Sequence, residues 1–498
     1  MEPVCDLFAK RHGGKNTTAV TLSNPKILTQ PDAQFPARSL RSLTPPIMLN
    51  DLHTTLQNLR QGQTSTSAEM ERSIAAAQSA RCDHVFLKTM FDEARAEAAQ
   101  PVRVAQPLAG LAVSVKDLFD IAGQTSRAGS VVLGDAAPAR HDALAVARLR
   151  AAGAALIGRT NMTEFAFSGV GVNPHFGTPA NAAFTDQPRI PGGSSSGAAI
   201  SVATGAAFIG LGSDSGGSIR IPAALNGLVG FKSTARRVPL AGTLPLSSTL
   251  DTACALTRSV RDAVLVHEIL AARRVTRSTA PLSAYRLAVT PNVMLDGLDP
   301  LVARAFERSL QRLRQAGAQI EEIKLTELDE LAPMQALGNF SAAESYTWHR
   351  HLLADQSARY DPRVLARILR GASMSASDYL ELIHFRRDWM ARMNKALDGF
   401  DAVLSPTVPL IAPPIAHVAP ATGVDAAQDQ ARDDAFFKVN AQLLRNPSAI
   451  NMLDGCAISL PCHAADEPPV GLMVWHGAMR DDMVLNAAVQ IEKLLQKQ

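Results

Sequence analysis

The sequence predicts an α/β fold in one large domain. Two stretches, residues 142–161 and 299–325, each carry apolar residues at helical spacing, then a glycine, then a short apolar segment of strand character. Gly153 and Gly317 are the expected helix ends. Helices that alternate with strands in this way are typical of layered α/β proteins. The 498-residue chain shows neither an internal repeat nor a long low-complexity tract, so we expect one domain over residues 48–498.

The other elements follow from periodicity in chain order. An amphipathic helix begins just after Met48, and alternating Leu111, Val113 and Val115 predict a strand directly before Lys116. The remaining expectations are a helical stretch over 67–99, a tightly buried segment over 198–212, a mainly helical region over about 327–400, a strand within 400–415 that leads into a proline-rich loop, a polar surface loop over 420–435, strands within 456–462 and 469–477, and a final helix over 482–497.

Composition argues against several classes of protein. Hydrophobic residues make up 46% of the chain and charged residues 19%, which supports a sizeable core and argues against global disorder. The 49 basic and 46 acidic residues leave a formal net charge of +3, so the sequence indicates no binding surface for nucleic acid or an anionic membrane. No run of 18 apolar residues is present, and we expect no transmembrane helix.

The five cysteines are few and scattered. This usage suits a reducing compartment better than a disulfide framework, and it predicts a cytoplasmic location. Cys456 and Cys462 are too far apart for a CxxC motif, and no histidine cluster accompanies them. We therefore expect no zinc site and interpret both residues as buried, inert thiols.

Residues 1–47 differ from the rest of the chain. They are polar, contain several prolines and show no sustained periodicity. We expect this extension to be poorly ordered, or to result from an upstream start codon, with a mitochondrial transit peptide as a further alternative. No apolar region follows its basic residues, so a secretory signal is not indicated.

Two glycine-serine clusters lie in residues 191–220, PGGSSSGAAISVATGAAFIGLGSDSGGSIR, and they place Ser194 and Ser218 24 positions apart. A phosphate-binding loop is one interpretation, but neither cluster fits G-x-x-x-x-G-K-[ST] or G-x-G-x-x-G. Sharp turns between a packed helix and a strand are a second. The third is nucleophilic catalysis, in which a Gly-Gly-Ser turn aims backbone N–H groups at the oxyanion that forms when Ser218 attacks a carbonyl.

A serine nucleophile needs a base. His141 and His175 are the nearest histidines, and neither lies in a recognisable triad context or near a G-x-S-x-G turn. A neutral lysine can serve instead, because burial lowers its pKa. Lys116 directly follows a strand at its carboxyl end, where α/β proteins place their sites, and Ser194 is the natural relay between Ser218 and Lys116. An ordinary lysine at the end of a strand is the alternative.

At this point the sequence resembles the amidase signature family. The segments VSVKD, PGGSSSGAAISVATG and GSDSGGSIRIPAALNGLVGFKST carry the resemblance, which extends over roughly residues 50–498. It implies Ser218 as nucleophile, Ser194 as bridging serine after a cis Gly193–Ser194 bond, and Lys116 as general base. It also implies an oxyanion hole formed by the backbone N–H groups of Ser215, Gly216, Gly217 and Ser218.

The resemblance has consequences for the fold and for cofactors. It implies a mixed, mostly parallel sheet of about eleven strands wrapped by helices, with no metal and no organic cofactor. The first cluster departs from the commoner GGSSGGSAA, and Ala198 replaces a common serine. Position 215 is Ser where Thr is frequent, which a backbone donor should tolerate. Neither departure touches the three catalytic positions.

Three functions stay open within this resemblance. A stand-alone amidohydrolase, which would act on a small-molecule amide and water, is the first. A glutaminase-type subunit of a tRNA-dependent amidotransferase is the second, although its segment after GFK resembles PTYGRVSRYG, whereas this chain has STARRVPLAGTLP. A catalytically inactive small-molecule-binding protein is the third. A homodimer is left open as the assembly.

Substrate-binding residues are harder to identify. The resemblance implies an acyl pocket formed near Phe165 to Ser168 and by the helical insert of about 327–400, where Tyr346, Trp348 and His349 are candidates. Ordinary helix packing is the alternative for those three side chains. Arg236 and Arg237 could recognise a carboxylate, but adjacent residues on a strand face opposite ways, so at most one of them would do so.

We predict that residues 1–47 are dispensable. A chain that begins at Met48 should keep its melting temperature and its turnover, because the first periodic helix begins only there. Thermal unfolding and an activity assay of the full-length and shortened proteins test this. A substantial loss of either property would show that the extension packs on the domain.

Overall fold

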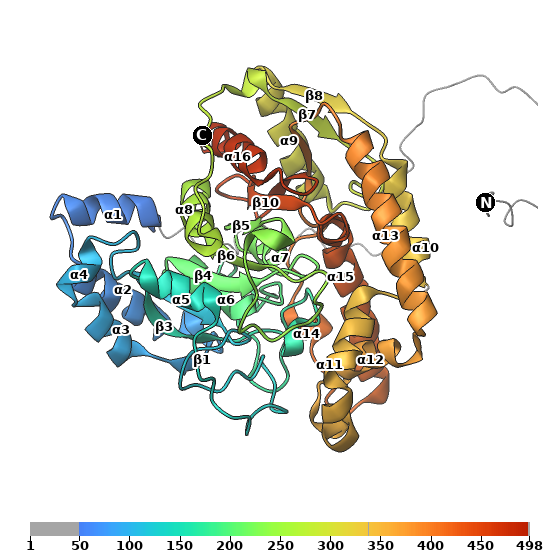
Figure 1. Cartoon of the computed structure of the whole chain (residues 1–498), viewed down its shortest axis with the longest axis horizontal. Coiled ribbons are helices and arrows are strands. Elements are labelled where there is room, and N and C mark those ends of the chain that lie inside the picture. Colours follow the sequence, from blue (N-terminus) through green and yellow to red (C-terminus); the bar gives the residue numbers. More distant parts are fainter. Residues whose placement is uncertain (1–48, 337, 497–498) are drawn as a thin grey trace, which may run out of the picture. The chain divides into compact units, whose positions relative to one another are not determined.

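One mixed sheet organises the fold (Figure 1). We analysed a computed structural model, which describes residues 49–336 and 338–496, so the expectations for residues 1–47 lie outside the described residues. In these two ranges, eleven strands pair in the order β1-β3-β2-β4-β6-β5-β10-β11-β9-β7-β8. They are β1 (Phe86–Thr89), β2 (Ala112–Lys116), β3 (Ala155–Thr160), β4 (Ile209–Ser213), β5 (Val229–Lys232), β6 (Ala253–Thr257), β7 (Arg286–Val289), β8 (Gln319–Glu322), β9 (Ala402–Pro406), β10 (Cys456–Pro461) and β11 (Gly471–His476).

The expected α/β class and a mixed sheet of about eleven strands are confirmed, but the sheet is not mostly parallel. Four of its ten pairings are parallel, namely β2 with β3 and β4, and β7 with β8 and β9. The other six are antiparallel. The helical crossovers that parallel pairing needs lie toward the two ends of the sheet, whereas β10 and β11 form an antiparallel pair joined by a loop in the middle.

Helices connect and cover these strands. The α-helices are α1 (Leu52–Arg60), α2 (Thr66–Ala77), α3 (Phe91–Ala98), α4 (Pro101–Val104), α5 (Leu144–Ala151), α6 (Ser196–Ala203), α7 (Arg220–Leu225), α8 (Val260–Ala271), α9 (Pro300–Gln315), α10 (Leu331–Ala336), α11 (Phe340–Gln356), α12 (Pro362–Leu369), α13 (Ala376–Ala396), α14 (Ile415–Val418), α15 (Ala426–Met452) and α16 (Asp481–Leu495). Short 3₁₀ turns are η1 (Ala80–Cys82), η2 (Glu164–Ala166), η3 (Ala235–Arg237), η4 (Leu282–Ala284), η5 (Thr326–Glu330), η6 (Ser357–Arg359) and η7 (Arg370–Ser373). None of the helices in the described part of the chain is long and apolar enough to cross a membrane.

The sheet is buried on both faces. Side chains of α1, α5, α8, α9 and α16 pack with one set of strand residues, and those of α2, α3, α6, α7, α13 and α15 pack with the alternating set. Helices α10 to α13 lie between β8 and β9 in sequence, and Figure 1 shows them in gold and orange along one side of the domain. Burial on both faces explains why β2, β3 and β4 are buried throughout.

Strand β4 shows why the chain carries glycine at alternating positions. Its sequence is IGLGS, and Gly210 and Gly212 lie beneath α6 while Ile209 and Leu211 pack on the opposite face. A Cβ atom at Gly210 would lie 2.7 Å from the carbonyl oxygen of Ala198, and one at Gly212 would lie 2.7 Å from Ser195 Oγ. Glycine therefore lets α6, and the serine cluster before it, sit directly on the sheet.

Two local expectations are wrong. The stretch 67–99 is not one helical region, because strand β1 interrupts it and pairs antiparallel with β3. The stretch 420–435 is not a loop throughout, because α15 begins at Ala426. The side chain of Asp425 caps that helix by accepting hydrogen bonds from the backbone N–H groups of Ala427 and Gln428. The first expectation fails because β1 pairs with a strand distant in sequence, and the second fails because Asp425 caps a helix there.

The described cysteines behave as expected from the sequence. Cys82, Cys254, Cys456 and Cys462 are all free and buried. Burial raises the pKa of Cys456 well above its usual value and that of Cys462 to about 12. These thiols are therefore protonated at neutral pH and unreactive.

Candidate active site

Lys116 ends β2 in the interior of the domain. Its side chain is fully buried, and Nζ donates hydrogen bonds to Ser194 Oγ at 2.7 Å and to Ser213 Oγ at 2.9 Å. Burial lowers the pKa of Lys116 to about 7, although the negative charges of Asp251 and Asp214 oppose that effect. The amine is therefore held by two hydroxyl groups, and its proton is easily lost near neutral pH.

Ser194 is fixed from both sides by backbone hydrogen bonds. The Gly193–Ser194 peptide bond is cis, as the resemblance implies. The N–H of Gly193 donates to the carbonyl of Gly169 at 2.8 Å, and the carbonyl of Ser194 accepts from the N–H of Thr163 at 3.1 Å. These bonds hold the chain immediately before α6, so the Ser194 hydroxyl stays beside the Lys116 amine.

Ser218 connects this buried pair with a cavity. The backbone N–H of Ser195 donates to the carbonyl of Ser218 at 3.3 Å, which joins the two glycine-serine clusters. The Ser218 side chain lines the cavity, whereas Lys116 and Ser194 lie behind it, out of contact with solvent. Among the described residues, no hydrogen bond involves the Ser218 hydroxyl, so the Lys116–Ser194 bond is formed in this structure and a Ser194–Ser218 bond is not.

The four backbone N–H groups expected in an oxyanion hole are not equivalent. The N–H of Gly217 donates to Asp214 Oδ1 at 2.8 Å and is therefore occupied. Within the described ranges, the N–H groups of Ser215, Gly216 and Ser218 make no hydrogen bond. Three of the four N–H groups are consequently free of intramolecular hydrogen bonds to the described residues, whereas the Gly217 N–H holds the turn.

A buried ion pair supports that turn. Arg220 and Asp214 are both fully buried, with 3.0 Å between Arg220 Nη2 and Asp214 Oδ1. Asn451 accepts from Arg220 Nη2 at 2.6 Å and donates to Asp214 Oδ1 at 2.9 Å. Burial alone would raise the pKa of Asp214, but the Arg220 guanidinium and its hydrogen bonds hold that pKa well below the usual range. The carboxylate that positions Gly217 thus stays charged.

A second carboxyl group anchors the start of the turn. Asp251 is buried and accepts hydrogen bonds from the Ser215 hydroxyl and from the N–H groups of Leu246, at 2.9 Å, and Ser247, at 3.1 Å. Burial raises the pKa of Asp251 to about 6. The turn is therefore tied to the loop that precedes β6 as well as to α7.

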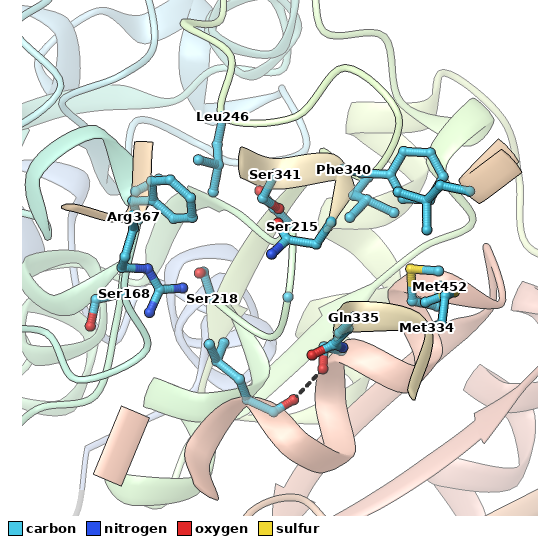
Figure 2. A pocket seen from close by; sticks show the side chains of 18 residues that line it. Ser168, Ser215, Ser218, Leu246, Met334, Gln335, Phe340, Ser341, Arg367 and Met452 are labelled. Carbon is cyan, nitrogen blue, oxygen red and sulfur yellow. Dashed lines mark hydrogen bonds between the residues drawn. The ribbon is translucent and has the colours of Figure 1, made fainter. Parts of the chain in front are cut away.

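The cavity in front of Ser218 is small and mostly apolar (Figure 2). It holds about 140 Å³ of free volume. Its lining residues are Ala166, Phe167, Ser168, Ser215, Gly216, Ser218, Leu246, Leu250, Met334, Gln335, Asn339, Phe340, Ser341, Arg367, Leu382, Leu444, Ser448 and Met452. Arg367 is the only charged residue among these. An enclosure of this size, with a serine hydroxyl and free N–H groups on one wall, suits a small substrate.

The five candidate substrate-binding residues divide into two groups. Ser168 lines the cavity, whereas Phe165, Tyr346, Trp348 and His349 do not. The Phe165 ring lies edge-on to His349, with 4.3 Å between ring centroids, and 6.1 Å from Trp348. Tyr346 packs against the core that contains Phe165. The rings of Phe165, Trp348 and His349 pack on one another. Together with Tyr346 they are packed side chains that do not line the cavity.

The other sequence candidates also lie elsewhere. Arg236 pairs with Asp454 and Arg237 with Asp481, and neither arginine lines the cavity. His175 contacts Glu164, with 2.8 Å between Nε2 and Oε1, and it does not line the cavity either. Its imidazole is therefore not placed to act on the Ser218 hydroxyl.

Sequence reasoning missed two residues of the site. Ser213 is the last residue of β4, and its role as a second partner of Lys116 follows from the parallel pairing of β2 and β4, which no local pattern reveals. Arg367 lies on α12, whose apolar spacing predicts a helix but not which face meets the cavity. No group of three or more His, Cys, Asp or Glu residues in the described part of the chain could hold a metal ion.

Comparison with known proteins gives consistent results. A family model described as "Amidase" matches residues 66–485. A "2-amino-5-chloromuconic acid deaminase" from Comamonas testosteroni is 34% identical over 395 residues, covering 78% of this chain and 82% of that protein. A glutamyl-tRNA(Gln) amidotransferase subunit from Salinispora tropica is 31% identical over 431 residues, covering 78% and 84%. A crystal structure of an amidase superposes with a TM-score of 0.78 at 33% identity, covering 89% of this chain and 99% of that one.

We predict that Arg220→Met destabilises the protein by about 3–5 kcal/mol, because it leaves the Asp214 carboxylate buried without its partner. Urea unfolding measures the change. The exposed pair of Arg392 and Glu330 gives a matched control, since Arg392→Met should change stability by less than about 1 kcal/mol. If Arg220→Met lowered the free energy of unfolding no more than Arg392→Met does, the buried ion pair would not be supporting the Ser215–Ser218 turn.

Proposed function

The chain belongs to the amidase signature family and is an amidohydrolase that acts on C–N bonds other than peptide bonds, and on that premise we propose that it works through an acyl-enzyme on Ser218. Ser194 relays protons, and Lys116 is the base. The observation that carries the proposal is the fully buried Lys116 amine, which donates to Ser194 Oγ at 2.7 Å. The substrate class is a carboxamide or a related small molecule.

The proposed acylation begins with proton transfer. Lys116, in its neutral form, accepts the proton of the Ser194 hydroxyl, and Ser194 accepts the proton of Ser218 as Ser218 Oγ attacks the carbonyl carbon. The Ser194–Ser218 hydrogen bond that this step requires would form when substrate fills the cavity, since catalytic contacts are often loose without ligand. Collapse of the tetrahedral intermediate breaks the C–N bond, and the proton returns through Ser194 to the leaving nitrogen.

Deacylation uses water in the same way. A water molecule attacks the ester of Ser218, and its proton passes through Ser194 to Lys116. The second tetrahedral intermediate then expels Ser218 Oγ, which recovers a proton through the same relay. The products are a carboxylic acid and an amine or ammonia. In both halves the free N–H groups of Ser215, Gly216 and Ser218 are the proposed donors to the oxyanion.

A glutaminase function is the second candidate, because several relatives are named as amidotransferase subunits. Several proteins that resemble this chain are named as subunits of glutamyl-tRNA(Gln) amidotransferases. A glutaminase that releases ammonia for such a complex would use the same Ser218 chemistry. The segment STARRVPLAGTLP, which departs from that branch, favours the stand-alone enzyme. Hydrolysis of free glutamine beside a panel of aliphatic amides, anilides, ureides and carbamates separates the two proposals, and the absence of any Ser218 reactivity would favour an inactive binding protein.

The relative named as a deaminase widens the panel. Its name indicates removal of an amino group from a muconic acid. If this chain acts similarly, its C–N bond need not be a carboxamide, so amino-substituted unsaturated acids belong in the screen.

We predict that Ser218→Ala lowers kcat by about 10³-fold or more, because the nucleophile is removed while the fold is kept. Ser309→Ala is the matched control, since Ser309 is also buried but donates to the Ala305 carbonyl of its own helix. Steady-state kinetics and a melting curve of both variants test this. A Ser218→Ala enzyme that retained more than about a tenth of the wild-type kcat would remove Ser218 from the mechanism.

We predict that kcat/KM rises with pH about tenfold per unit and reaches a plateau above pH 7, because Lys116 must be neutral to accept a proton and its pKa is about 7. Lys116→Ala should be nearly inactive, and Lys116→Arg should not restore activity, since a guanidinium keeps its proton. Ser194→Ala should be impaired less if water replaces the relay. Substantial activity in Lys116→Arg would exclude proton transfer through this position.

A further inference from the structure

Among the described residues that line the cavity, Arg367 is the one that carries a charge. It lies on α12, and in Figure 2 its guanidinium points into the cavity, on the same side as Ser168 and Ser218. Its side chain makes no hydrogen bond and no ion pair within the described ranges, and the buried Nε atom has no partner. Its guanidinium lies over the ring of Phe167, 4.7 Å from the centroid. An arginine in an apolar cavity is therefore left without an anion.

A neighbour on the same helix shows what a structural arginine looks like here. Arg363, one turn earlier, is buried and donates from each of its three guanidinium nitrogens: to Asp433 Oδ1 at 2.6 Å and to the carbonyls of Val418, at 2.8 Å, and Ala419, at 2.7 Å. Arg367 has none of these. Arg363 is therefore a structural arginine, whereas the N–H donors of Arg367 are unpaired within the described chain and the side chain lines the cavity.

The charge of Arg367 persists although the environment disfavours it. Burial lowers the pKa of Arg367 to about 10, and the positive charge of Arg370 acts in the same direction. The side chain is still cationic at neutral pH. A half-buried cation without a counter-ion is unfavourable, and an incoming anion would relieve that penalty. The five donors of a guanidinium match the two oxygens of a carboxylate in a planar, bidentate arrangement.

The rest of the lining also bears on which ligand would suit Arg367. Ser168, Gln335, Asn339, Ser341 and Ser448 are neutral, and no acidic residue lines the described cavity. A cationic substrate would meet Arg367 without compensation, and a neutral one would leave it unpaired. The apolar wall formed by the leucine, methionine and phenylalanine side chains suits a short hydrocarbon chain.

From this juxtaposition we propose that Arg367 binds a free carboxylate on the substrate, so that the enzyme hydrolyses small anionic amides such as half-amides of dicarboxylic acids. The proposal rests on the function proposed for Ser218. The carboxylate pairs with the guanidinium, the hydrocarbon chain fills the apolar part of the cavity, and the amide carbonyl lies at Ser218. Arg367 thereby selects the substrate and orients it but takes no part in proton transfer.

Matched substrates test the proposal. Succinamate, glutaramate and adipamate are compared with butanamide, pentanamide and hexanamide, in which a methyl group replaces the carboxylate. The wild-type enzyme should favour the anionic member of each cognate pair by tenfold or more in kcat/KM. Arg367→Met should lower kcat/KM on the anionic amides by about 10–100-fold, mainly through KM, and change it by less than about threefold on the neutral ones. Arg367→Lys should be intermediate.

The control variant is Arg370→Met, which removes the neighbouring exposed positive charge but does not touch the cavity lining. It should leave the preference for anionic amides unchanged. Equal losses on anionic and neutral amides in Arg367→Met would assign Arg367 a packing role over Phe167 and overturn the proposal. A wild-type preference for the neutral amides would overturn it as well.

A second measurement does not depend on turnover. A small neutral fluorophosphonate should label Ser218, which mass spectrometry detects, and succinate, glutarate or adipate should slow that labelling. Protection should be lost in Arg367→Met and kept in Arg370→Met. Labelling of Ser218 without protection by any dicarboxylate would contradict the carboxylate site while leaving the nucleophile intact. Failure to label Ser218 would contradict the function on which the proposal rests.

Discussion

Removal of the Lys116 amine from water is the constraint on which the site depends. A lysine at the end of an interior strand has no solvent to stabilise its charge, and here two hydroxyls, those of Ser194 and Ser213, are its hydrogen-bond partners. Burial disfavours the charged form and lowers the pKa of the amine to about 7. The carboxyl groups of Asp214 and Asp251 lie near enough to moderate this effect, yet each is engaged in holding the turn that carries Ser218.

The two glycine-serine clusters make different contributions around the buried amine. The first brings a hydroxyl to Lys116, and the second brings Ser218 and free N–H groups to the cavity. The small residues between them allow α6 to lie on β4, since a side chain at Gly210 would collide with Ala198 of that helix and one at Gly212 with Ser195, directly before it. The same close packing excludes water from Lys116. The placement of Ser194 beside Lys116 and the desolvation of the Lys116 amine therefore share one cause, the direct contact of α6 with the sheet.

Much of this arrangement could be predicted because it is encoded locally. Lys116, Ser194 and Ser218 each lie in a short segment with a recognisable pattern, and the helix-to-strand units around Gly153 and Gly317 form as expected. The balance of parallel and antiparallel pairs could not be predicted, because strand order depends on contacts between distant segments. Ser213 and Arg367 were missed for the same reason. Their importance comes from a neighbouring strand or a cavity wall formed elsewhere in the chain.

The ionisation of Lys116 distinguishes a neutral base from an ordinary charged lysine. NMR titration of protein labelled with ¹³C at lysine Cε follows that ionisation, with the Lys116 resonance assigned by its absence in Lys116→Arg and separated in the same way from the second buried lysine, Lys232. With Lys116 as the base, the midpoint should lie near pH 7. A midpoint near the free-lysine value of about 10.4 would contradict this role, because the amine would then be charged at neutral pH and could not serve as the base.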